Sequence, residues 1–148
     1  MNFEGLQDLM NAFNQLASED EIEKVDRRII SEAEMIVHRV MKQKIPLSSD
    51  NSKSGRGLKG GGESRPRHGH AKENIPISKP KKNQSGVSGM VGWKLNDNSE
   101  YFYMKFVNWG TIYTPPKDFI DTTLSQTESQ FSRIAETEYQ RFLNQYLR

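Results

Sequence analysis

The chain has 148 residues, of which 34% are hydrophobic and 27% are charged, and it contains no cysteine. This length predicts one domain, residues 1–148, with room for a hydrophobic core. The absence of cysteine excludes disulfides and thiolate chemistry. No apolar run reaches the roughly 18 residues of a membrane span. Residues 1–4 lack the basic start and apolar run of a signal peptide, so we expect no membrane association.

Charge is distributed unevenly along the chain. Residues 46–82 contain nine Lys or Arg and three acidic residues, a net charge of +6, whereas the whole chain carries only +2. The sequence therefore combines an acidic body with a basic arm. Within the arm, residues 48–65 contain a single large apolar residue, Leu58. Because they cannot bury enough surface to offset ordering entropy, we predict a long flexible basic loop.

Two helices are predicted before the basic arm. Residues 3–17 carry apolar side chains at helical spacing, which indicates a short amphipathic helix. Ser18 and Glu21 fit a capping box, so a second helix should begin there. It should extend to about Lys44, because Pro46 blocks its continuation.

Three strands and a long helix are predicted after the arm. Residues 74–78 suit a short edge strand, and residues 87–95 a second strand. Residues 101–107 are aromatic and β-branched and give the strongest strand pattern. Residues 119–146 form one helical apolar stripe. The sequence thus predicts an α+β fold, with an antiparallel sheet of about three to four strands packed by long N-terminal and C-terminal helices.

The junction after the strongest predicted strand organises the second half of the chain. Gly110 follows Trp109 and permits a backbone turn that other residues resist; if it takes a positive φ, any side chain there is strained. Pro115 and Pro116 then prevent a ladder or helix from continuing. We expect Trp109 to be largely buried and to anchor the junction between the strand and the helix that begins at Phe119.

The order of these motifs resembles one family, the head–tail joining proteins of long-tailed double-stranded DNA phages. These neck or tail-completion proteins are often called minor tail components. The segments 70–75 and 91–93 also resemble that family. Asn108 departs from it, because the family often has an acidic residue there, and so do Ile120 and Asp121, where Arg or Pro is common. The positions that match the motif are Tyr103, Phe106, Trp109, Gly110, Thr111, Pro115, Pro116 and Phe119.

The resemblance implies a structural virion protein of the phage neck. Such a protein joins the DNA-filled head, on its connector side, to the tail, and is assembled as a hexameric ring. The partners that it implies are other copies of the chain, the head connector or head-completion proteins, and the tail terminator or tail-tube proteins. The expected location is the virion neck, with the host cytoplasm before assembly.

No catalytic pattern accompanies these motifs. The sequence contains no recognisable Ser/His/Asp arrangement, and the pair His68 and His70 has no convincing third metal ligand. We therefore predict a protein that is not an enzyme and that uses no cofactor or metal.

A second reading is a non-specific nucleic-acid-binding protein that acts through residues 53–82. Lys and Arg there would neutralise phosphates without reading sequence. The segment has no aromatic residue on which bases could stack, which weakens this reading. In a neck ring the same arm could contact DNA in the channel. The candidate DNA-facing residues are Lys53, Arg56, Lys59, Arg65 and Arg67.

Overall fold

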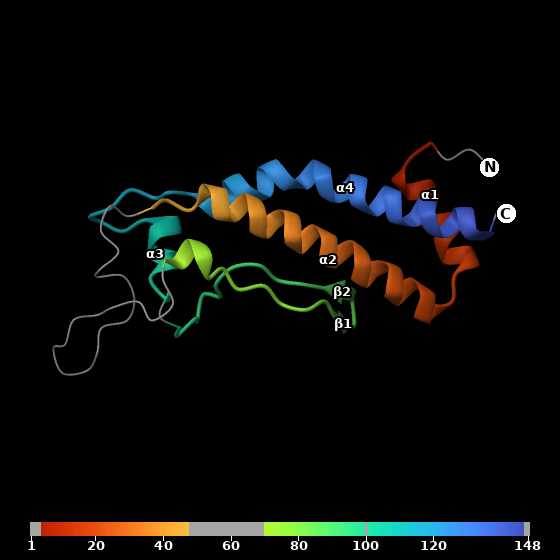
Figure 1. Cartoon of the computed structure of the whole chain (residues 1–148), viewed down its shortest axis with the longest axis horizontal. Coiled ribbons are helices and arrows are strands. Elements are labelled where there is room, and N and C mark those ends of the chain that lie inside the picture. Colours follow the sequence, from red (N-terminus) through yellow and green to blue (C-terminus); the bar gives the residue numbers. More distant parts are fainter. Residues whose placement is uncertain (1–3, 48–69, 100, 147–148) are drawn as a thin grey trace. The chain divides into compact units, whose positions relative to one another are not determined.

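A computed structural model describes residues 4–47, 70–99 and 101–146 of the chain (Figure 1). This part has an α+β fold with four α-helices, one short 3₁₀ helix and one two-stranded antiparallel sheet. It divides into two compact units. The first comprises the described parts of Met1–Ile36, Ser78–Met90 and Gln126–Arg148, and the second those of Val37–Ile77 and Val91–Ser125. No helix in the described ranges has the length and apolar character that crossing a membrane requires.

The first unit is built on three helices, which confirm the predicted helical stripes. They are α1 (Leu6–Leu16) and the parts of α2 (Glu19–Lys44) and α4 (Phe119–Tyr146) that belong to this unit. Phe13 lies at the centre, with its ring centroid 4.8 Å from those of both Tyr139 and Phe142. The buried core consists of Leu9, Phe13, Val25, Ile29, Ala135, Tyr139, Phe142 and Leu143.

The predicted capping box at the start of α2 is confirmed. The backbone N–H of Ser18 donates to Glu21 Oε2 at 2.9 Å, and Ser18 Oγ accepts from the N–H of Glu21 at 3.4 Å. The Tyr146 hydroxyl donates to Glu21 Oε1 at 2.6 Å. These hydrogen bonds, that from Tyr146 first, lower the pKa of Glu21. The last turn of α4 is thereby tied to the first turn of α2.

A second carboxylate of α2 is less favourably placed. Asp26 is half-buried and accepts a hydrogen bond from the Tyr139 hydroxyl at 3.3 Å. Burial raises the pKa of Asp26, although the hydrogen bond from Tyr139 opposes the rise. Burial, followed by the charge of Asp26, raises the pKa of Tyr139 to about 12.

Asp26→Asn is therefore expected to stabilise the protein more at neutral pH than in acid. A raised folded-state pKa means that the folded protein binds the proton more tightly than the unfolded chain does. The corresponding stability is complete below the ordinary Asp pKa and is lost as the pH rises through the folded-state pKa. Asn cannot ionise, so it escapes that loss. Urea unfolding between about pH 3 and about pH 7 measures the difference, with the exposed Asp20→Asn as control. A difference that does not change with pH would contradict this account.

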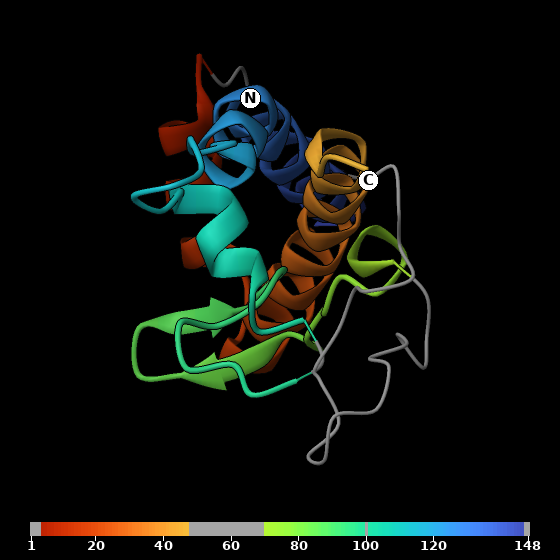
Figure 2. The same cartoon turned by 90° about the vertical axis from the view of Figure 1, so that its left-hand side faces the viewer.

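The hairpin formed by β1 (Lys81–Asn83) and β2 (Gly86–Ser88) belongs to the first unit (Figure 2). Glu34 of α2, which is buried, holds the base of this hairpin. Its Oε1 accepts from the N–H of Met90 at 2.9 Å and from Ser78 Oγ at 3.3 Å. A Cβ at position 89 would overlap the Glu34 carboxylate and Ile30 Cγ2, so a larger residue there would have to displace these side chains. The carbonyl oxygen of Pro80 accepts from Arg27 at 2.6 Å and adds a second attachment to α2.

The second unit contains the short helices η1 (Ala71–Glu73) and α3 (Met104–Trp109). They pack with the C-terminal part of α2 and the first turns of α4 that belong to this unit. Phe119, at the start of α4, is only 1% exposed. The buried core consists of Met41, Ile45, Ala71, Ile75, Tyr101, Met104 and Phe119.

The prediction of a strand over residues 101–107 is wrong. Residues 101–103 form a turn, and α3 follows. The buried positions are Tyr101, Met104 and Asn108, whose spacings of three and four residues match a helix and not a strand. The alternation of aromatic residues was misleading, because a short apolar run fits both periods.

The sheet is also smaller than the three to four strands expected. Residues 74–78 and 87–95 do not form continuous strands, although Ile77 and Val91 pair in an isolated antiparallel bridge. In the second segment β2 already ends at Ser88, and Gly92, whose φ of 102° lies outside the β region, prevents a strand from extending beyond Val91. The flexible loop predicted over residues 48–65 lies outside the described residues.

Candidate functional site

Asn108 joins α3 to α4 in the second unit. Its side chain is fully buried, and Oδ1 accepts from the N–H of Ile120 at 3.0 Å, which satisfies a free donor in the first turn of α4. Its backbone carbonyl accepts from the N–H of Asp118 at 3.0 Å. The carbonyl of Val107 accepts likewise from Lys117 at 3.1 Å. The loop between the two helices is thus fixed at both ends.

Gly110 ends α3 in the turn that glycine permits, with a positive φ. Its φ is 77° and its N–H donates to the carbonyl of Phe106 at 2.8 Å. A Cβ at this position would lie 2.7 Å from the backbone nitrogen of Pro116 and 2.8 Å from the carbonyl oxygen of Thr114. Both the backbone angle and the lack of space therefore require glycine.

The loop then forms a closed turn over residues 111–114, which we call the 111–114 turn. The N–H of Thr111 donates to the carbonyl of Thr114 at 2.9 Å, and that of Thr114 returns a hydrogen bond at 3.3 Å. Thr111 Oγ1 accepts from the backbone N–H of both Tyr113 and Thr114 at 3.2 Å. Ile112 and Tyr113, at the middle of the turn, are each 90% exposed. The hydrogen bonds hold two large apolar side chains in solvent.

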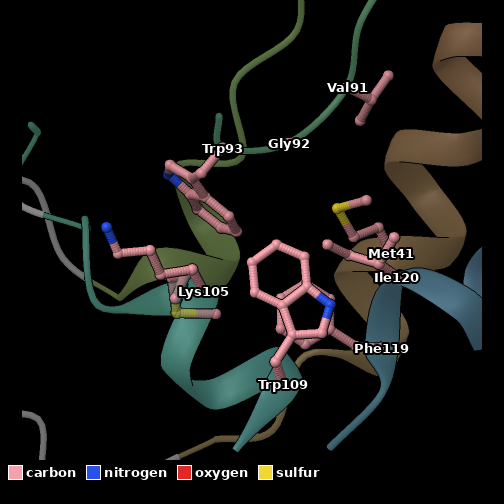
Figure 3. A pocket seen from close by; sticks show the side chains of 9 residues that line it. Met41, Val91, Gly92, Trp93, Lys105, Trp109, Phe119 and Ile120 are labelled. Carbon is pink, nitrogen blue, oxygen red and sulfur yellow. The ribbon is translucent and has the colours of Figure 1, made fainter. Parts of the chain in front are cut away.

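An apolar hollow of about 50 Å³ lies within the second unit (Figure 3). We call it the tryptophan hollow, because both tryptophans of the chain line it and point toward one another in Figure 3. Lys105 is the one charged side chain among the described residues that line it, and its Nζ donates to the carbonyl of Leu95 at 3.1 Å. The lining residues are Met41, Val91, Gly92, Trp93, Met104, Lys105, Trp109, Phe119 and Ile120.

The structure places the eight motif residues around this junction, but in unequal roles. Phe119 is buried, and Tyr103 packs against the core of the second unit. Gly110 and Thr111 shape the loop, where Pro115 and Pro116 are exposed. Phe106 is half-exposed, at 48%.

Trp109 is not the buried anchor that the sequence predicted, because it is 52% exposed. The buried face of α3 carries Met104 and Asn108, and Trp109 follows one position beyond it. Its ring therefore covers the rim of the tryptophan hollow, and Phe119 is the buried aromatic of this junction.

Sequence reasoning did not single out the most exposed residues of the site, Ile112 and Tyr113. The available signal was an apolar pair between Gly110 and Pro115, in a loop too short to bury it. The five candidate DNA-facing residues of the basic arm, Lys53, Arg56, Lys59, Arg65 and Arg67, lie outside the described residues. Among residues 4–47, 70–99 and 101–146, no cluster of His, Asp or Glu suits a metal ion.

In a comparison with known proteins, no protein-family model, curated protein or solved structure matches the chain.

Proposed function

We propose that this chain is a structural protein of the phage neck that joins the DNA-filled head to the tail as an oligomeric ring. The ordered motif from Tyr103 to Phe119 suggests the family. The observation that carries the proposal is the exposure of four large apolar side chains within residues 106–113, which we call the 106–113 surface: Phe106, Trp109, Ile112 and Tyr113. Soluble monomers rarely display large apolar patches, whereas assembling proteins need them.

The rigidity of this surface also supports an assembly role. The hydrogen bonds of the 111–114 turn and the attachment of the loop through Asn108 leave little freedom to lose on binding. A preformed contact surface associates at a lower entropic cost than a loop that must be ordered first. In a ring, each copy presents such a surface to its neighbour, and other surfaces remain for the connector and the tail.

The proposal predicts the phenotype of Tyr113→Asp in a phage that lacks the wild-type protein. Filled heads and finished tails should accumulate separately, because a charge at an apolar interface opposes assembly while leaving an exposed position free to fold. Electron microscopy of lysates counts joined and unjoined particles. Leu95→Asp is the matched control, since Leu95 is 70% exposed in the same unit but lies outside residues 106–113. Normal head–tail joining by Tyr113→Asp would count against a role for residues 106–113. Normal joining by phage that lack this chain altogether would refute the proposed function.

The alternative is non-specific nucleic-acid binding through residues 53–82. In the described part of that segment Lys79 and Lys81 are exposed, whereas Lys82 lies 3.2 Å from Glu23 and is partly neutralised. On this alternative, Lys79→Ala combined with Lys81→Ala would lower DNA affinity and flatten its salt dependence. Tyr113→Asp would then bind DNA as the wild type does.

A further inference from the structure

The 111–114 turn has the properties of a projection that inserts into another surface. Its middle residues, Ile112 and Tyr113, are apolar and 90% exposed, and its backbone is closed by hydrogen bonds in both directions. Residues 111–116 contain no charged side chain. The projection can therefore enter an apolar site without burying a charge, which would be costly.

The tryptophan hollow has the properties of a site that receives such a projection. Its volume of about 50 Å³ has room for about four water-sized groups. An isoleucine side chain consists of four carbon atoms, so it fits this volume. Aliphatic and aromatic side chains form the lining, and Gly92 adds bare backbone. Lys105 already donates to the carbonyl of Leu95. Among the described residues no acidic side chain lines the hollow, so this lining suits an apolar occupant better than a polar ligand.

The chain does not fill its own hollow with its own turn. The loop leaves the hollow at Trp109 and returns to it at Phe119, yet Ile112 between them is 90% exposed. The N–H of Lys117 and that of Asp118 bind the carbonyls of α3, so the loop is held in this position. An apolar projection and an apolar hollow of matching size on one chain are complementary parts of a contact between copies.

We propose that Ile112 of one copy inserts into the tryptophan hollow of a second copy. This inference rests on the proposed function, because it names the contact by which neighbouring copies join. Phe106 and Trp109, which lie on α3 with the lining residues Met104 and Lys105, have half-exposed rings that add apolar area. When the contact does not close on itself between two copies, its repetition generates a ring or an open chain.

Single-cysteine variants test the proposed pair of surfaces directly, since the chain contains no cysteine of its own. Ile112→Cys and Lys105→Cys, mixed and treated with a short bismaleimide, should give a covalent heterodimer, because Lys105 lines the hollow. Met35→Cys is the control partner, since Met35 is exposed and does not line the hollow. Equal crosslinking of Ile112→Cys to both partners would overturn the proposal.

Tryptophan fluorescence provides a second readout, because both tryptophans line the hollow. With rising concentration, wild-type emission should move to shorter wavelengths as sedimentation shows association. Ile112→Asp should weaken self-association by about tenfold or more, as expected for a central interface residue. Met35→Asp should associate as the wild type does, since Met35 is exposed and does not line the hollow. A wild-type protein that remains monomeric, with unchanged emission, at its highest soluble concentration would overturn the proposal.

These results separate the inference from the proposed function. If Ile112→Cys crosslinks to Lys105→Cys but the wild-type protein does not join heads to tails, the contact is supported and the proposed function is refuted. Normal joining by Ile112→Asp, in phage otherwise lacking the protein, would retain the function and refute the contact.

Discussion

Gly110→Val is expected to displace the loop after α3 and to cost several kcal/mol of stability in the second unit. A side chain at φ 77° is strained by about 1–3 kcal/mol. The overlap of its Cβ with Pro116 and Thr114 adds to this strain, because both neighbouring atoms are backbone. The hydrogen bonds that fix the loop to Val107 and Asn108 should weaken. Amide hydrogen exchange at Lys117, Asp118 and Ile120 measures that loss.

Gly86→Val is the matched control for this substitution. Gly86 also has a positive φ, of 124°, but no atom lies within 4 Å of a Cβ built there. This variant therefore carries backbone strain without overlap and should lose only about 1–3 kcal/mol. Equal losses for the two variants would show that the close contact with Pro116 and Thr114 contributes nothing. On the proposed neck function, phage carrying Gly110→Val should also accumulate unjoined heads and tails.

Phe13→Ala is expected to destabilise the first unit by about 3–5 kcal/mol. Phe13 is only 1% exposed, and its substitution removes ring contacts with both Tyr139 and Phe142 at the centre of the core. Unfolding in urea, followed by circular dichroism, gives the loss. Phe131→Ala is the control, because Phe131 of α4 is 44% exposed and its truncation should cost about 1 kcal/mol or less. Similar losses for both variants would contradict the assignment of Phe13 to the core.

Features that depend on neighbours in sequence could be predicted. Ser18, Glu21 and Pro46 specify the start and end of α2 through contacts within a few residues, and the structure has that helix as expected. The turn at Gly110 follows from a glycine placed between a tryptophan and a proline loop, and the glycine has a positive φ there. In each case the deciding interaction is local.

Features that depend on distant residues could not be predicted. Residues 101–107 satisfy strand and helix patterns alike, and only packing against Met41 and Phe119 selects the helical face. Asn108 looks like an ordinary polar residue until α4 returns to place Ile120 beside it. The exposure of Ile112 is likewise set by the folded loop, so its candidate role was not visible in the sequence.

The contact between Gly89 and Glu34 has an evolutionary consequence. The carboxylate reaches the backbone of Met90 only because no Cβ occupies position 89. A larger residue at 89 is accommodated more easily once position 34 carries a shorter side chain, although Ile30 Cγ2 would still lie 2.8 Å from its Cβ, and the reverse order passes through an intermediate in which the Glu34 carboxylate must move. The two positions are therefore epistatic, and we expect them to covary among descendants of this sequence.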